Sequence, residues 1–233
     1  MMSGLQCDRQ MGFGARQGGS HERTVVNSVL QRNERSFRAG IAMRLSALDQ
    51  APISEGMSPG QALRNSVDLA RALDEFGYTR YWVAEHHGTP MLACASPEAL
   101  IGPIASATSR IRVGSGGVML PHYSALKVAE TFGMLSGMYP GRIDLAVGRA
   151  PGSDPMTAFA LQRDRRHPAP DDFPDQLAEL LAYLRDGLPP GHRFSRLVHV
   201  ATNPERPEVW LLGSSPQSAV WAAEAGGMRR WAI

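Results

Sequence analysis

Two adjacent histidines follow an acidic residue in this chain, and the three together could carry chemistry. Glu85, His86 and His87 come directly after the apolar run at residues 81–84. Histidine titrates near neutrality, so a general acid/base or hydrogen-bonding role is one interpretation. A structural histidine at the end of a strand is the other. Adjacent side chains point in different directions and no HExxH spacing is present, so the pattern does not favour metal binding.

A glycine-rich stretch interrupts another apolar run. Ser115 lies between Gly114 and the pair Gly116-Gly117. Glycines inside a strand are either irregularities of the strand or positions where a flat ligand approaches the backbone closely. The stretch is not the GxGxxG fingerprint of dinucleotide-binding proteins, and the GxSxG motif of serine hydrolases is also absent.

A candidate anion site lies near the C-terminal end of the sequence. Ser214, Ser215 and Gln217 stand where an expected strand ends and a helix begins, so free backbone N–H groups and the helix dipole would favour a phosphate. The alternative is that Ser215 only caps its helix. Arg149 could neutralise a phosphate in bidentate geometry, or it could be a surface arginine paired with Asp154.

The elements that must position these residues alternate between strands and helices. Strands are expected at 44–48, 80–84, 111–120, 142–147 and 209–212. Helices are expected after Ser58-Pro59, from Ser96-Pro97 to about 109, from Ser124 to about 138, at 172–185 and at 216–225. The first helix is expected to bury Leu63, Val67, Ala70, Leu73 and Phe76 and to end at Gly77.

This alternation predicts an α/β fold with a parallel sheet. An open doubly wound sheet and a closed barrel both fit the pattern. In either fold, ligands collect at the carboxyl ends of the strands, so the polar residues described above are expected to share one rim.

Composition narrows the functional classes. The net charge is only +2, which gives no case for a nucleic-acid or membrane partner. The two cysteines, Cys7 and Cys94, argue against a disulfide scaffold or zinc site and fit a reducing compartment. No apolar run reaches transmembrane length and no signal peptide is recognisable, so a cytoplasmic protein is expected.

Five segments together resemble the bacterial luciferase-like, flavin-dependent monooxygenases, and most closely the single-chain, FMN-type subgroup. The matching segments are residues 43–53, 81–87, 112–121, 141–154 and 212–219. The resemblance covers about 43–226 and implies a partial TIM (β/α)8 barrel with about five βα units. It also implies reduced FMN supplied by a separate flavin reductase, molecular oxygen as co-substrate, and oxygenation of a small organic substrate.

The resemblance also implies roles for the residues around the flavin ring. His86 matches the family's active-site histidine, which would bind or move protons near the ring, and Glu85 would orient it. Ser115, Gly116 and Gly117 match the segment that lies against the flavin and often contains a non-prolyl cis peptide, here between Gly116 and Gly117.

Phosphate-binding roles follow from the same resemblance. Arg149 matches the arginine that reaches the FMN phosphate. Ser214, Ser215 and Gln217 match the phosphate-binding turn.

Both ends of the chain depart from the family pattern. Residues 1–42 are expected to be disordered or a non-native extension, with Met43 as a natural start, and 227–233 form a divergent tail without a sixth strand. A mis-assigned start together with a frameshift or premature stop would explain both ends. A five-unit sheet has two open edges, which can pair with another chain. A homo-oligomer is therefore one possible state of the protein.

Three functions remain open at this point. The chain is an FMN-dependent monooxygenase or an inactive fragment of one, a deazaflavin-dependent enzyme that transfers hydride, or a non-catalytic half-barrel that binds flavin or a partner.

Overall fold

The computed structural model describes residues 43–149, 154–168, 171–185, 187–197, 204–213, 216–224 and 231–232. The strands in these ranges are β1 (Ser46–Asp49), β2 (Arg80–Val83), β3 (Arg112–Met119), β4 (Ile143–Gly148), β5 (Glu208–Leu212) and β6 (Trp231–Ala232). The helices are α2 (Pro59–Glu75), α3 (Pro97–Ala107), the 3-10 turn η1 (Leu120–His122), α4 (Ala125–Met138), α5 (Pro155–Leu161), α6 (Phe173–Leu184) and α7 (Pro216–Glu224).

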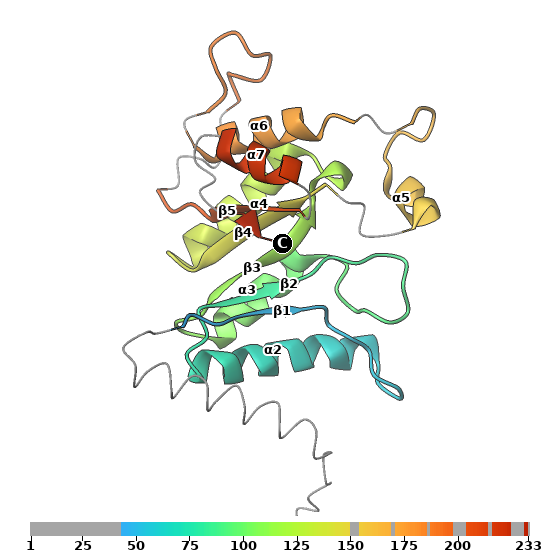
Figure 1. The fold of residues 1–233 in the computed structure, drawn as a ribbon, viewed down its shortest axis with the longest axis vertical. Helices are drawn as coiled ribbons and strands as arrows, with labels where there is room; N and C mark the ends of the chain where they lie inside the picture. Colours follow the sequence, from blue (N-terminus) through green and yellow to red (C-terminus); the bar gives the residue numbers. More distant parts are fainter. Residues whose placement is uncertain are drawn as a thin grey trace, which may run out of the picture. The chain divides into compact units, whose positions relative to one another are not determined.

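The order of the strands decides between the two expected architectures. Each strand pairs in parallel with the next one along the chain, in the order β1-β2-β3-β4-β5-β6, and Figure 1 shows β1 to β5 of this order. A doubly wound sheet would reverse this order at a switch point, whereas a (β/α)8 barrel follows the chain around. The sheet is therefore part of a barrel and contains about five βα units, as the family resemblance implies.

One face of the sheet packs against the helices and forms the core. Side chains alternate between the two faces of a strand, so every second apolar residue points toward α3, α4 and α6. The strand residues of this core are Tyr81, Val83, Val113, Val118, Ile143, Leu145, Val147 and Leu211. They pack with helix residues that include Ile101, Ile104, Phe132, Leu135, Leu177 and Leu180.

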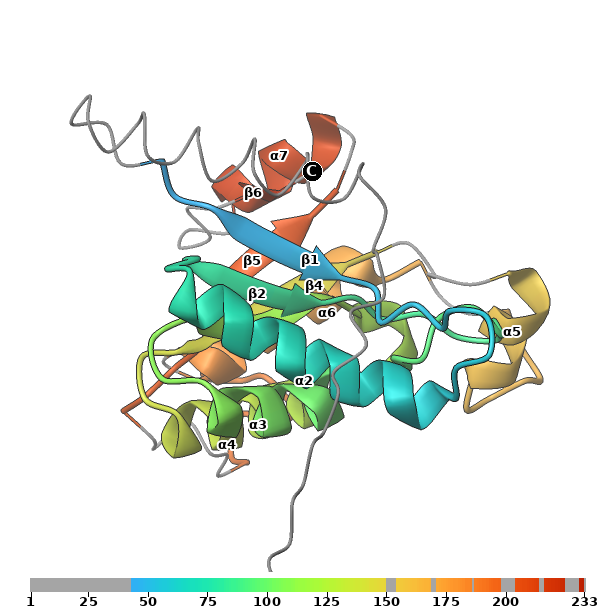
Figure 2. The same cartoon turned by 90° about the horizontal axis from the view of Figure 1, so that it is seen from below.

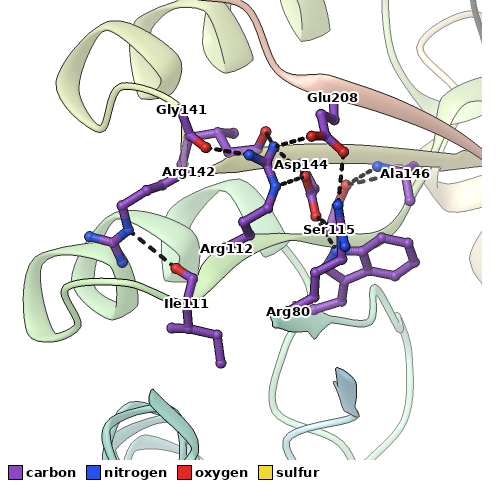
Figure 3. Close-up of polar contacts among 11 residues, drawn as sticks. Arg80, Ile111, Arg112, Ser115, Gly141, Arg142, Asp144, Ala146 and Glu208 are labelled. Carbon is purple, nitrogen blue, oxygen red and sulfur yellow. Dashed lines mark hydrogen bonds and ion pairs between the residues drawn. The ribbon is translucent and has the colours of Figure 1, made fainter. Parts of the chain in front are cut away.

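The opposite face has a charged layer at the amino ends of the strands. Figure 3 shows Arg80, Arg112 and Glu208 around Asp144, whose side chain is fully buried. Asp144 accepts from Arg80 Nε at 2.9 Å, from Arg112 Nε at 2.8 Å and from Trp82 Nε1 at 2.9 Å. Because a buried carboxylate is costly without partners, these donors make its position tolerable. The layer joins β2, β3, β4 and β5.

Serine residues begin two helices as expected. Ser58 accepts from Gln61 N at 3.2 Å before α2, and Ser124 accepts from Lys127 N at 3.2 Å before α4. Ser96 precedes α3 but makes no such bond with its side chain. Gly77 follows α2 with φ of +76°, the left-handed conformation that glycine adopts without strain.

The predicted apolar face of α2 was partly wrong. Its fully buried positions are Ala62, Ser66, Ala70 and Asp74, whereas Phe76 is 56% exposed. Asp74 faces inward because it accepts from the backbone N–H groups of three residues before β3, at 2.7, 3.2 and 2.8 Å. Burial raises the pKa of Asp74, but these hydrogen bonds together lower it below its usual value.

Two elements appear where none was expected. Helix α5 lies in a stretch that reads as polar and proline-rich, although Asp154-Pro155 repeats the cap-and-proline start of α2. Strand β6 lies in the tail, where a sixth strand was predicted to be absent, and pairs with Leu211 and Leu212. Two residues are too few for a periodic signal. The expected extension at 1–42 lies outside the described residues, as do 227–230 and 233 of the tail.

Within the described ranges, no helix is both long and apolar enough to cross a membrane.

The charged layer leads to a stability prediction. Replacing Asp144 with Ala leaves two guanidinium groups without their buried partner, so the free energy of unfolding in urea should fall by about 3–5 kcal/mol. The matched control is Asp68→Ala on the surface of α2, where the pair with Arg71 is exposed and its loss should cost less than about 1 kcal/mol. Similar losses in the two variants would contradict a structural role for the layer.

Candidate functional site

The carboxyl ends of the strands form a rim with the loops that follow them. In Figure 2 the arrowheads of β1 and β2 point toward the side on which α5 lies. The loop after β2 contacts α5, since a Cβ atom built on Gly88 would meet the side chain of Thr157. It also contacts the end of β3 through Glu85 and Met119. The predicted site residue Glu85 therefore lies against β3, at the residue two positions beyond Gly117.

The glycine-rich stretch of β3 has the backbone that the sequence predicts. The peptide bond between Gly116 and Gly117 is cis, which confirms the expectation. A Cβ on Gly117 would lie 2.7 Å from the carbonyl oxygen of Ala146 and 2.7 Å from Leu212 Cδ1. A Cβ on Gly116 would lie 2.6 Å from Leu48 Cδ1. Glycine is therefore required by close packing at both positions.

Gly116 also lines a groove on the sheet face that is turned away from the helices. The groove has a volume of about 390 Å³, a size within the range of small-molecule sites. Its walls are Ser46, Ala47, Leu48, Arg80, Trp82, Trp210 and Leu212. The two tryptophan rings meet edge to face, with centroids 5.0 Å apart, and the Arg80 guanidinium lies 4.9 Å from the Trp210 ring. These walls suit a flat, largely apolar group.

Ser115 uses its side chain inside the sheet. Its hydroxyl donates to the Ala146 carbonyl oxygen at 2.9 Å and accepts from the Ala146 N–H at 3.0 Å (Figure 3). The residue is fully buried. Its predicted contact with a cofactor would therefore have to come from the backbone of this stretch.

The acidic residue before the two histidines holds a different histidine from the one expected. Glu85 was predicted to orient His86, but its Oε1 lies 2.7 Å from His87 Nε2. His86 instead donates its backbone N–H to the Cys94 carbonyl at 3.0 Å. Among the described residues, His86 Nδ1 is buried without a hydrogen-bond partner. An unpartnered buried nitrogen is costly, so this atom is available to a ligand group.

Two further titratable side chains lie beside this cluster, and sequence reasoning missed both. Burial raises the pKa of Tyr123 and of Glu98, and the nearby Glu85 carboxylate raises both further. Burial also raises the pKa of the Cys94 thiol to about 11, so this cysteine is not a ready nucleophile. Glu98 lies in the first turn of α3 and Tyr123 follows η1, and no motif spacing marks either one.

Arg149 lies beside α7. Its NH2 group contacts both carboxylate oxygens of Asp171, at 2.9 and 2.8 Å, and its guanidinium lies 5.9 Å from the Trp221 ring of α7. The alternative pairing with Asp154 was wrong, because that carboxylate caps α5 at Met156 and Thr157. The Arg149 side chain is 53% exposed and open to an anion.

The predicted phosphate turn precedes helix α7. Ser214, Ser215 and the side chain of Gln217 lie outside the described residues. The helix that follows the turn does form, from Pro216, at the position expected. In the described part of the chain, no three His, Cys, Asp or Glu side chains gather as a metal ion would require.

A family model described as luciferase-like monooxygenase matches residues 43–228. The chain belongs to this family. Its sequence is 54% identical over 185 residues to the uncharacterized protein YwcH of Bacillus subtilis, covering 78% of this chain and 54% of that protein. It is 45% identical to the N-acetyl-S-alkylcysteine monooxygenase of the same organism, covering 79% and 55%. The luciferase-like chain thus spans about half the length of the relatives it matches.

Solved structures of the luciferase-like fold agree with this assignment. Apo-MsnO8 superposes with a TM-score of 0.67 at 46% identity, covering 78% of this chain and 53% of that one. The oxygenating constituent of 3,6-diketocamphane monooxygenase from Pseudomonas putida, solved in complex with FMN, superposes with a TM-score of 0.62. At 21% identity, over 78% of this chain and 55% of that one, the second match shows a shared fold only.

Close packing at Gly117 leads to the second prediction. Gly117→Ala should lower the free energy of unfolding by about 1–3 kcal/mol, because the backbone carbonyl of Ala146 has no room to move. Gly102→Ala is the matched control. It lies within α3 with open space around its Cβ position and should be neutral or stabilising by up to about 1 kcal/mol. Unfolding in urea gives both values, and an unaffected Gly117→Ala protein would show that the segment adapts.

Proposed function

We propose that this chain supplies the flavin site of an FMN-dependent monooxygenase that uses reduced FMN and molecular oxygen to oxygenate a small organic substrate. The observation that carries the proposal is the groove lined by Gly116, Trp82 and Trp210 on the sheet face turned away from the helices. Gly116 adds no side chain to this wall, so a flat ring could lie against the groove between Trp82 and Trp210. Membership of the luciferase-like family supports the choice of a flavin.

The described residues fit the parts of FMN. Leu48, Trp82 and Trp210 offer apolar and aromatic walls to a flat ring system. The exposed guanidinium of Arg149 offers a cation to the phosphate, next to a helix that begins at Pro216. We infer that Ser214, Ser215 and Gln217 complete this phosphate site, as the resemblance implies.

When bound and reduced by a separate flavin reductase, the flavin supplies the electrons for oxygen chemistry. The chain's residues have simpler tasks. The unpartnered Nδ1 of His86 can accept or hold a proton at the rim. The apolar walls of the groove would keep water away from the ring, and Arg149 would hold the phosphate.

Deazaflavin-dependent enzymes share this fold, and a secondary alcohol dehydrogenase that uses coenzyme F420 superposes with a TM-score of 0.56 at 20% identity over 78% of this chain and 56% of that one. Such a likeness shows the fold alone. A competition between FMN and a deazaflavin for the wild-type chain separates the two cofactors, and preference for the deazaflavin would replace the monooxygenase proposal with hydride transfer.

Opposite effects of two variants would identify Arg149 as a phosphate ligand. Titration of the chain with FMN, followed by flavin fluorescence, should show affinity about tenfold or more weaker in Arg149→Ala, because a charge-assisted hydrogen bond is lost. Asp171→Asn should bind several-fold more tightly, since Asp171 competes for the same guanidinium. Unchanged affinity in both variants would remove Arg149 from the site.

His86 should affect turnover more than flavin binding. In an oxygen-consumption assay with a flavin reductase, His86→Ala should lower the rate by about 10²–10⁴-fold if the imidazole moves protons. FMN affinity should change far less. His122→Ala is the control, since that imidazole lies against His87 rather than beside His86. Wild-type flavin binding without any oxygen-dependent product would instead support a non-catalytic half-barrel.

A further inference from the structure

We propose that Glu85 is a positioning residue with two tasks: it clamps the end of β3 and it holds His87, so that His86 alone is left for the ligand. Its value for catalysis depends on the proposed function. The clamp itself does not, because it consists of contacts within the chain.

The first task concerns the part of β3 that has no strand beside it on the β2 side. Strand β2 pairs with β3 only as far as Val83 and Ser115. The cis bond at Gly116-Gly117 and the register shift against β4 both come after this point. The end of β3 therefore lacks a backbone neighbour on the β2 side, within the described sheet, where the site needs a fixed shape.

The Glu85 carboxylate takes the place of that missing neighbour. Its Oε2 accepts from the backbone N–H of Met119 at 3.1 Å, two residues beyond Gly117. On the other side, a Cβ on Gly148 would lie 3.2 Å from Met119 Cε, so the Met119 side chain already rests on β4. The end of β3 is thus held from both sides.

The second task separates the two histidines. Glu85 Oε1 lies 2.7 Å from His87 Nε2, and both side chains are largely buried, at 0% and 13% exposure. The His87 ring meets His122 of η1 edge to face, with centroids 6.0 Å apart. One carboxylate therefore fixes His87 against the turn that follows β3. His86 has no such contact through its buried Nδ1 among the described residues.

A neighbouring carboxyl group provides a matched control. Glu98 is partly buried and interacts electrostatically with both His87 and Glu85. Its Oε2 is buried without a hydrogen-bond partner in the described part of the chain. Glu98→Gln thus alters the charge of the same cluster without removing a bond to Met119 or to His87.

The test uses NMR on the flavin-free chain. In Glu85→Ala, amide hydrogen exchange at Met119 should rise about tenfold or more, because a hydrogen bond to a charged acceptor is lost. Glu85→Gln should retain the protection, since its amide oxygen can still accept from Met119 N–H. The imidazole ¹⁵N signals of His87 should shift in both variants. Glu98→Gln should leave Met119 exchange unchanged.

Two results would overturn the inference. One is wild-type exchange at Met119 in Glu85→Ala, and the other is an equal effect of Glu98→Gln. If Glu85→Ala does not fold, the conservative variant decides, because unchanged His87 signals in Glu85→Gln would show that the pair does not form.

Flavin titration then tests the positioning role itself. Glu85→Ala should weaken FMN binding several-fold, and Glu85→Gln should restore most of the affinity because it rebuilds the Met119 clamp. A failure of the wild-type chain to bind FMN would count against the proposed function while leaving the exchange result intact. Normal binding by a folded Glu85→Ala protein with a loosened Met119 amide would show that the clamp does not serve the flavin.

Discussion

The buried carboxylate of Asp144 is the interaction on which the described sheet depends most. It accepts hydrogen bonds from Arg80 and Arg112, which lie at the first positions of two other strands. Glu208 on a fourth strand pairs with Arg80 at 2.8 Å. An arginine or the Asp144 carboxylate left without its partner in this layer would lower the stability of the fold by several kcal/mol. The strand ends must therefore meet in one arrangement. The shape of the groove that Arg80 and Gly116 line depends on this arrangement.

The glycines of β3 follow from the same packing. Gly114 pairs in register with Asp144, and a Cβ on it would run into the Asp144 backbone. Farther along the same strand, Gly116 and Gly117 also lack side chains. The inner face thus changes along its length from charged, to glycine-lined, to the histidine rim. Arg80 belongs to both the charged layer and the groove wall, so the part that stabilises the sheet adjoins the part that could bind a ligand.

The sequence was most informative where one residue type has one physical explanation. Ser58 and Ser124 predicted where helices begin, because a serine hydroxyl can accept a hydrogen bond from a free backbone N–H. The cis bond between Gly116 and Gly117 was predicted from the resemblance of this segment to the family pattern. Patterns failed where a polar side chain takes partners that are distant in sequence. Asp74 of α2 faces the interior because it accepts hydrogen bonds from residues 109–111. Arg149 pairs with Asp171 instead of Asp154. Neither partner could be predicted from spacing along the chain.

The two ends of the proposed flavin site lie on different strands, so its geometry depends on how β3, β4 and β5 are aligned. Ser115 fixes the first of these alignments, because its hydroxyl bonds to both the N–H and the carbonyl of Ala146. Immediately after this point the register shifts, and Glu85 takes over at Met119. A polar side chain thus bonds to the backbone on each side of the glycine pair, and at Met119 the Glu85 carboxylate takes the place of pairing with β2. On the proposed function, a ligand would meet this irregular backbone between the side-chain hydrogen bonds of Ser115 and Glu85.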